Sequence, residues 1–399
     1  MRIVLIADVF PPLRSSGAVQ LRDLSQEFAR QGHDVTVLVP DHEIGEGWRI
    51  EMWNGVRVVR LRSPKAKDVA YVRRTIAELL MPFTMLYNLH SSPLANERWE
   101  GVVWYSPTIF LGPIAKALKK MSNCRSYLVI RDIFPEWTVN MGLMGRGLPY
   151  RFFKMIERYQ YSVADVIGVQ TPANLDYFEG WGCRPNHRVE VLQNWLAEAQ
   201  ASGCRISLDC TPLAGRKIFI YAGNMGIAQG MDVLLDLAEC LRSRADIGFL
   251  FVGRGSEAHR LRAEVAARTL GNVVFFDEVE PSEIPDLYAQ CHIGLVALDP
   301  RHRTHNIPGK FLSYIQAGLP VLASINPGND LAALIDEAQV GYTVCNGDVA
   351  TLQEYALKLV EDIGRDAEIG YRCKTLSTRL FSPEAAVRQI IQSLQSDII

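Results

Sequence analysis

Two loops of the chain carry glycine, the first together with serine, at places where a phosphate group could be bound. Residues 8–18 contain Ser16 and Gly17, and residues 221–230 contain three glycines. Each loop follows a strand-like run and opens a helical pattern, where unpaired backbone N–H groups and the helix dipole attract an anion. Either loop alone could be an ordinary turn between a strand and a helix. Because they stand at equivalent positions in the two halves of the chain, together they predict phosphate binding.

Two further segments of the second half add positive charge. Arg254 lies between Gly253 and a second glycine at the end of a strand-like run, and it suits either a diphosphate or an ordinary exposed position. Farther along, Asn306 and a proline lead into a helical pattern that opens with Gly309 and Lys310. Free N–H groups and an ammonium at that point could meet the negative charge of a departing nucleoside diphosphate. The alternative is a solvated lysine at a helix start.

One acidic residue of the first half stands at a comparable place. Asp132 comes just after the strand-like run that ends at Ile130. A carboxylate at the carboxyl end of a parallel strand can bind sugar hydroxyls or stabilise a sugar with developing positive charge. The alternative is a helix-capping aspartate or a partner for Arg131.

Residues 65–87 combine an apolar helical stretch with four basic residues, Lys65, Lys67, Arg73 and Arg74. Such a helix could rest on anionic lipid. Helices that pack on a sheet have much the same pattern, so core packing stays open as an alternative.

Short β-branched runs alternate with helical patterns almost from end to end, which predicts parallel sheets in an α/β fold. The pattern starts afresh in the second half, so we expect two doubly wound domains. The expected boundaries are residues 1–197, a more polar linker at 198–214, a second domain at 215–380, and a final helix at 381–399 that can cross back to the first domain.

Composition excludes some classes of protein. The net charge is −2, so nucleic-acid binding has no overall electrostatic support. Residues 1–195 carry an excess of about five positive charges and the rest of the chain is negative by about seven. The eight cysteines form no zinc-like spacing, and no signal peptide or apolar run of spanning length is evident. We therefore expect a cytoplasmic protein with reduced thiols and no metal.

Five motifs occur in an ordered series: F-P-P…S-G at 10–17, G-H-D-V-T-V-L at 32–38, the glycine loop at 223–230, V-G-R-G at 252–255 and G-L-P-V at 318–321. In this order and spacing the chain resembles the retaining glycosyltransferases of family four over essentially its whole length. The resemblance implies the GT-B fold, in which two Rossmann-like domains face each other across a cleft, and a nucleotide-sugar donor. It implies no metal cofactor.

A finer resemblance comes from G-N-M-G-x-x-Q-G at 223–230, R-D-I-F-P-E at 131–136 and P-G-K-F at 308–311. Together these look like the WbuB-like branch. That branch implies transfer of an amino sugar, of fucosamine type, to lipid-linked intermediates of surface polysaccharides such as O-antigen lipopolysaccharide.

The chain departs from the family pattern at four positions. Asn224 and Gln229 stand where the family has Arg and Lys, and His305 and Ser313 stand where it has two glutamates. Ser313 thus replaces the acid that normally holds the ribose. The resemblance also implies that the nucleotide lies against residues 253–255 and near Glu278.

The resulting expectation is a retaining transferase that moves an N-acetylated sugar from a UDP-sugar to a lipid-linked saccharide at the inner face of the cytoplasmic membrane. Ser16 and Gly17 would hold the diphosphate from one domain and Gly309 and Lys310 from the other, with Asp132 facing the sugar. Two alternatives stay open: a UDP-sugar epimerase on the same fold, and a non-catalytic subunit that binds a nucleotide-sugar.

Overall fold

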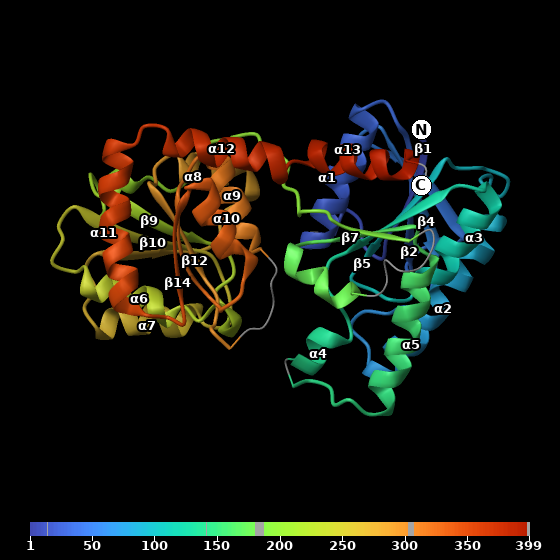
Figure 1. Ribbon diagram of the computed structural model, residues 1–399, viewed down its shortest axis with the longest axis horizontal. Helices are drawn as coiled ribbons and strands as arrows, with labels where there is room; N and C mark the ends of the chain where they lie inside the picture. Colours follow the sequence, from blue (N-terminus) through green and yellow to red (C-terminus); the bar gives the residue numbers. More distant parts are fainter. Residues whose placement is uncertain (14, 141, 180–186, 302–306, 397–399) are drawn as a thin grey trace. The chain divides into compact units, whose positions relative to one another are not determined.

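The computed structural model of the protein describes residues 1–13, 15–140, 142–179, 187–301 and 307–396 (Figure 1). The chain forms two compact units, one of Met1–Trp195 with Pro383–Ile399 and the other of Leu196–Ser382. Each unit is a largely parallel sheet between helices. The predicted class, α/β with two Rossmann-like halves, is confirmed.

In the described part of the chain, the sheet of the first unit has eight strands in the order β3-β4-β2-β1-β5-β6-β7-β8. The strands are β1 Arg2–Ile6, β2 Asp34–Asp41, β3 Trp48–Trp53, β4 Val56–Arg62, β5 Gly101–Ser106, β6 Arg125–Ile130, β7 Val166–Val169 and β8 Arg188–Val191. The pairing of β3 with β4 is antiparallel, and the other pairings are parallel. The order of strands turns between β1 and β5, where sheets of this kind bind ligands.

Helices cover both faces of this sheet. They are α1 Ser16–Arg30, α2 Tyr71–His90, α3 Gly112–Ser122, α4 Glu136–Asn140, α5 Leu148–Val163 and α13 Pro383–Gln395, with 3-10 turns η1 Pro172–Asn174 and η2 Asp176–Phe178. The core between the sheet and α2, α3 and α5 takes alternate strand residues such as Val4 and Trp104. The core under α1 and α13 takes the intervening ones, such as Leu5 and Val103. This alternation is the period of two that the strands impose.

The last helix, α13, is joined to the first unit through one buried carboxylate. Glu190 of β8 accepts hydrogen bonds from the Tyr127 hydroxyl at 2.9 Å, from Gln389 at 3.0 Å and from Ser393 at 2.9 Å. Apolar residues of α13, Val387 among them, complete the core beside α1. The first unit is therefore closed by a segment that follows the whole second unit in the chain.

The sheet of the second unit, within the described residues, has six strands in the order β11-β10-β9-β12-β13-β14. They are β9 Lys217–Ala222, β10 Ile247–Val252, β11 Val273–Phe276, β12 Ile293–Ala297, β13 Val321–Ile325 and β14 Gly341–Cys345. The pairings are parallel. Here the order turns between β9 and β12.

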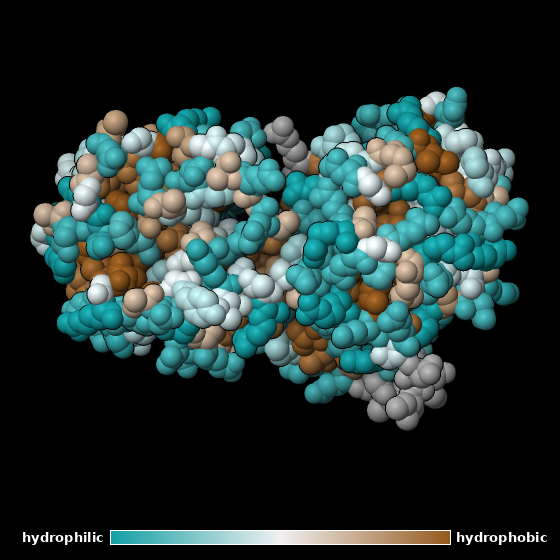
Figure 2. Space-filling view, turned by 90° about the horizontal axis from the view of Figure 1, so that it is seen from above, coloured by the Kyte–Doolittle hydropathy of each residue, from teal (hydrophilic) through white to brown (hydrophobic). Residues whose placement is uncertain are grey.

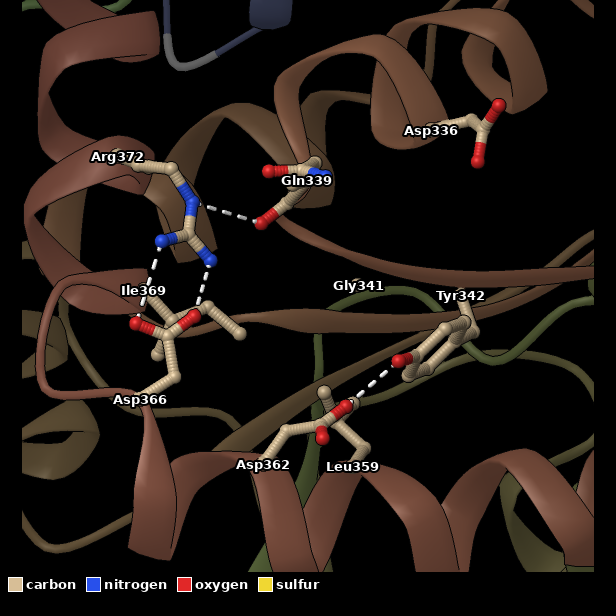
Figure 3. Close-up of a pocket in the computed structure, with 9 residues that line it drawn as sticks. All are labelled: Asp336, Gln339, Gly341, Tyr342, Leu359, Asp362, Asp366, Ile369 and Arg372. Atoms are coloured by element: carbon tan, nitrogen blue, oxygen red, sulfur yellow. Dashed lines mark hydrogen bonds and ion pairs between the residues drawn. The ribbon is translucent and has the colours of Figure 1, made fainter.

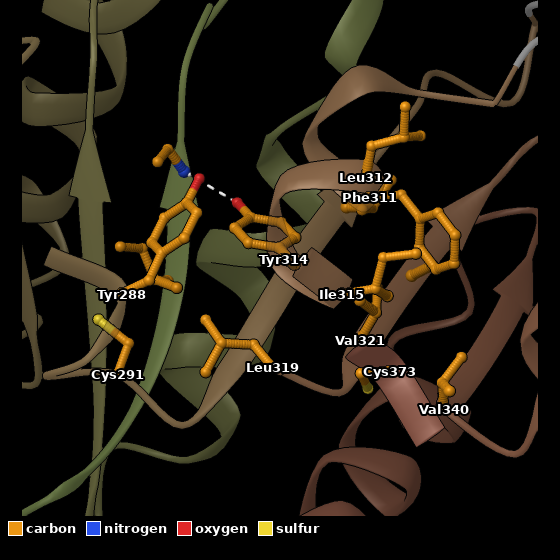
Figure 4. Packing of buried hydrophobic residues seen from close by; sticks show 14 of the residues in the cluster. Tyr288, Cys291, Phe311, Leu312, Tyr314, Ile315, Leu319, Val321, Val340 and Cys373 are labelled. Atoms are coloured by element: carbon orange, nitrogen blue, oxygen red, sulfur yellow. Dashed lines mark hydrogen bonds between the residues drawn. The ribbon is translucent and has the colours of Figure 1, made fainter. Parts of the chain in front are cut away.

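The helices of the second unit are α6 Asp232–Cys240, α7 Ala258–Ala267, α8 Ile284–Tyr288, α9 Gly309–Ala317, α10 Asp330–Ala338, α11 Val349–Arg365 and α12 Ile369–Leu380, with 3-10 turns η3 Leu208–Cys210, η4 Ile227–Gln229 and η5 Pro281–Glu283. One core lies under α8, α9, α10 and α12, where Tyr288 and Tyr314 pack together (Figure 4). The other lies under α6, α7 and α11.

Three features differ from the sequence expectation. Residues 198–214, expected to be a linker, belong to the second unit, and Ile206, Leu208 and Leu213 are buried in its core. Strands β3 and β14 were not foreseen, because β3 is half exposed and lacks a strong apolar run.

Figure 2 shows one face of the molecule, on which hydrophobic residues form separate small areas among hydrophilic ones.

Candidate active site

The glycine loops that follow β9 and β10 pack backbone against backbone. The amide N–H of Gly223 donates to the carbonyl of Val252 at 2.8 Å, and that of Met225 donates to the carbonyl of Arg254 at 2.7 Å. Gly253 has a φ of +148°, and a Cβ there would lie 2.0 Å from the carbonyl oxygen of Gly223. Only glycine permits so close an approach. The loops therefore form one continuous backbone surface at the carboxyl edge of the sheet.

The two amide side chains of the first glycine loop hold that loop together. Gln229 Oε1 accepts from the amide N–H of Gly226 at 2.8 Å and from Asn224 Nδ2 at 3.2 Å. The carbonyl of Asn224 accepts from the Tyr221 hydroxyl at 2.6 Å. The two positions at which the family pattern has cations thus carry a neutral pair that stabilises the loop.

Lys310 supplies a cation to this surface from the first turn of α9. Its Nζ lies 4.7 Å from the centre of the Tyr221 ring, and a Cβ on Gly223 would come within 3.0 Å of its Cε. Burial lowers the pKa of Lys310 to about 8. Desolvation disfavours the charged form, and the aromatic face offsets only part of that cost. The ammonium is held beside the glycine loop, and no group in the described part of the chain acts on it as a strong counter-charge.

The neighbours of Lys310 have different environments. Gly309 is exposed at the start of α9, and a Cβ there would meet nothing within 4 Å. Ser313 Oγ donates to the carbonyl of Lys310 at 2.9 Å and lies 3.3 Å from the hydroxyl of buried Tyr288. Both partners of Ser313 lie on helices of the second unit, Lys310 on α9 and Tyr288 on α8. Asn306 and His305 lie outside the described residues.

Arg254 and Glu278 form an ion pair on the surface of the second unit. Arg254 Nε lies 2.9 Å from a Glu278 carboxylate oxygen, and the two side chains are 80% and 54% exposed. A pair so exposed contributes little to stability because water screens it. The structure thus brings together two of the predicted nucleotide contacts, both free to rearrange toward a ligand.

In the first unit, Ser16 and Gly17 occupy the first turn of α1, and Ser15 is the N-cap. The Ser15 hydroxyl accepts from the amide N–H of Ala18 at 3.3 Å. A Cβ on Gly17 would lie 3.5 Å from the ring of Tyr105, so this turn packs closely on the end of β5. The predicted helix start is therefore at the switch point of the first sheet.

Asp132 follows β6 on the same edge. Protein atoms around its carboxyl raise the pKa of Asp132, although part of the residue surface is exposed, and the charge of Arg131 offsets only part of this effect. Burial also raises the pKa of Tyr105, on which Asp8, Arg131 and Asp132 all act electrostatically. Gly17 and Asp132 are thus brought to one region around Tyr105.

Three buried polar atoms follow the strands β1, β6 and β7 at this edge of the first sheet. Asp8 Oδ1, Arg131 Nη1 and Thr171 Oγ1 are buried, and among the described residues they have no hydrogen-bond partner. Burial raises the pKa of Asp8, and Lys67 and Arg74 act against that shift. Each unpaired buried group costs about 1–3 kcal/mol. Asp8 was not among the predicted site residues, although it follows β1 just as Asp132 follows β6.

The described residues show no group of three or more His, Cys, Asp or Glu side chains that could hold a metal ion. A hollow of about 280 Å³ lies elsewhere in the second unit, where β14 begins and where Arg372 bonds to Gln339 and Asp366 (Figure 3). The start of β14 is at the amino edge of the sheet, so this hollow is separate from the glycine loops.

Two family models match the chain. The family described as "Glycosyl transferases group 1" matches residues 216–362, and the "Glycosyl transferase 4-like domain" matches residues 17–195. The chain is a glycosyltransferase. Each matched range falls within one of the two units. Together the two ranges span most of the chain.

A relative of this glycosyltransferase is the protein of Escherichia coli (strain K12) assigned to colanic acid biosynthesis as glycosyl transferase WcaI. It is 24% identical over 374 residues, which are 86% of this chain and 88% of the relative. Two solved structures share the fold. Sucrose-phosphate synthase from Thermosynechococcus elongatus has a TM-score of 0.70 at 16% identity over 98% of both chains. Anabaena Alr3699/HepE, in complex with UDP, has a TM-score of 0.68 at 15% identity over 100% of both. These structures support the GT-B fold.

Among the described residues, no helix combines the length and the apolar character needed to cross a membrane.

Proposed function

We propose that this glycosyltransferase moves an N-acetylated amino or deoxyamino sugar from a UDP-sugar to a lipid-linked saccharide, with retention at the anomeric carbon. The second unit binds the donor, and the first unit supplies the groups that meet the sugar and the acceptor hydroxyl. The reaction belongs to the synthesis of a surface polysaccharide, at the cytoplasmic face of the membrane.

The placement of Lys310 is the observation that carries the proposal. Breaking the bond between the anomeric carbon and the UDP oxygen leaves extra negative charge on the diphosphate. The ammonium of Lys310, held beside the backbone surface of the glycine loops, can stabilise that charge. The exposed pair of Arg254 and Glu278 can open so that Arg254 adds a second positive charge. Leaving-group stabilisation would then come from protein groups.

Two carboxyls of the first unit suit a sugar. Asp8 and Asp132 keep part of their surface exposed, and their carboxyls can accept hydrogen bonds from hydroxyl groups. The acceptor hydroxyl loses its proton as it bonds to the anomeric carbon. A carboxylate with a raised pKa is a better base for that proton, and Asp132 is our candidate.

The nature of the donor and the acceptor rests on resemblance. UDP is bound by Anabaena Alr3699/HepE, which shares the fold. Polysaccharide synthesis is the context of the relative WcaI, and the WbuB-like motifs favour a fucosamine-type sugar.

The test is a panel of UDP-sugars incubated with a lipid-linked disaccharide. We expect transfer from an N-acetylated donor, with the new linkage in the donor's anomeric configuration by NMR. Asp132→Asn should reduce turnover about a hundredfold or more, as for loss of a general base, and leave the affinity for UDP unchanged. Transfer with inversion would contradict retention. Interconversion of UDP-sugars without an acceptor would instead indicate an epimerase, for which Asp8 and Asp132 provide two carboxyls.

A further inference from the structure

Helix α2 of the first unit is apolar on two opposite faces. One face packs in the core through Ala77, Met81, Met85 and Leu89. The other face is between 48% and 74% exposed and carries Val72, Ile76, Leu80, Phe83 and Tyr87. Steps of three and four residues place these five side chains in a single stripe along the helix. The fold of the unit requires only the first face.

Helix α5 repeats this arrangement. Leu148, Phe152, Met155 and Tyr159 again follow steps of three and four residues, and they are 36% to 81% exposed. Scattered exposed apolar residues are normal in a folded protein, whereas a continuous set marks an interaction surface. The stripes on α2 and α5 are two continuous sets of this kind, so they indicate an interaction surface on the first unit.

Helix α3 lies between the two stripes. It packs against both α2 and α5, and all three cover the same face of the sheet (Figure 1). Its exposed residues are Lys116 and Lys120, and Lys116 Nζ lies 5.6 Å from the ring centre of Tyr159. The outer surface of these three helices is thus apolar at both sides and cationic between them.

The charge on this three-helix face has one sign. Its exposed ionised residues are Arg73, Arg74, Lys116, Lys120, Arg151 and Arg158. The acidic residues of the three helices are Glu78, whose side chain is 17% exposed beside Arg74, and Glu157, which is buried. Apolar stripes flanked by basic residues on the same three helices fit the interface of a bilayer that contains anionic lipid.

We propose that the first unit docks on an anionic phospholipid surface through the three-helix face, with the stripes of α2 and α5 inserted among the head groups. The inference rests on the proposed function in one respect, namely that the acceptor is lipid-linked. The docking face includes α3 and α5 in addition to residues 65–87, the segment for which the sequence alone indicated lipid contact.

Vesicle co-sedimentation tests the docking face. Full-length protein should bind phosphatidylcholine–phosphatidylglycerol vesicles and bind phosphatidylcholine vesicles weakly. Lys116→Glu with Lys120→Glu should weaken binding by about thirtyfold or more, because each basic residue near an anionic surface contributes about one kilocalorie per mole. Ile76→Ser with Phe83→Ser, and separately Leu148→Ser with Met155→Ser, should each weaken it as well. Tyr371→Ser, at a 67% exposed site of the second unit, is the matched control and should bind as the parent does.

Equal binding by the α5 variant and the parent would overturn the two-stripe face, as would equal binding to neutral vesicles. A dimer that becomes monomeric in the α2 or α5 variants would assign the face to a second copy of the chain. Circular dichroism and urea unfolding of the same proteins show whether the variant first unit folds, and UDP binding is measured without vesicles in parallel. A parent that binds UDP but no vesicles overturns only the docking face, and one that binds vesicles but no nucleotide overturns only the proposed function.

Discussion

The protonation of Lys310 should control the affinity for UDP. Burial lowers the pKa of this lysine to about 8, from 10.5 for an exposed lysine. That shift corresponds to about 3 kcal/mol against the charged form. A bound diphosphate supplies the missing counter-charge, so it should raise the pKa of Lys310 again. Binding must then take up a proton wherever free Lys310 is neutral.

The magnitude follows from the protonated fraction. At pH 8 half of the free protein carries the charge, so binding should take up about half a proton. Above pH 8 the affinity should fall by nearly tenfold per pH unit, because phosphate groups are already ionised there and only the lysine changes. Isothermal titration with UDP at pH 7, 8 and 9, in buffers of different ionisation enthalpy, measures both quantities.

Lys310→Met should remove the pH dependence and weaken UDP binding at pH 7. Because the buried charge is costly, the same substitution should leave the second unit as stable as before or more stable. Lys358→Met is the matched control, since Lys358 also lies 4.7 Å from a tyrosine ring, that of Tyr342, but is itself exposed. A loss of stability in Lys310→Met with unchanged UDP affinity would refute the reasoning and make Lys310 a structural residue.

Three further outcomes are expected. Gly253→Ala should abolish UDP binding by forcing the two glycine loops apart, whereas Gly271→Ala, with open space around it, should bind UDP normally by the same titration. Glu190→Leu should lower the free energy of unfolding in urea by about 2–4 kcal/mol, because three donors lose their acceptor. The control Glu384→Gln, at an exposed site of α13, should change that free energy little. Equal effects of the two substitutions would show that α13 is not held through Glu190. Burial raises the pKa of Glu157 to about 7 in the folded state. Above pH 5 the folded state therefore binds more protons than the unfolded state. The free energy of unfolding should then fall by about 2–3 kcal/mol as the pH rises from 5 to 8. Denaturation of Glu157→Gln should show no such fall, and a parent that gains stability over this interval would contradict the assignment.

The strands and helices near the site could be predicted because their signals are local. Alternating apolar runs gave most of the parallel strands, and the proline and glycine around residues 309–317 gave the bounds of α9. The placement of Lys310 at a helix start was predictable for the same reason. The packing of its side chain over Tyr221 was not, because that contact joins residues far apart in the chain.

Long-range contacts also explain what was missed. Asp8 lay in a loop singled out for its glycine and serine, but its burial depends on strands and helices that no local pattern specifies. The polar composition of residues 198–214 suggests a linker, although a few apolar residues within it are buried. The apolar stretch at 65–87 was compatible with core packing or lipid contact, and α2 has a face suited to each.

The return of α13 to the first unit has a consequence for biosynthesis. Domains usually fold in order as the chain emerges from the ribosome. Here the core beneath α1 stays open until Val387 and Ile390 have been made, and that happens only after the whole second unit. The nascent first unit therefore exposes apolar surface until α13 has been synthesised. A chaperone that binds apolar surface would bind the incomplete amino-terminal half during that time. Premature termination after residue 382 would leave a first unit that never completes its core.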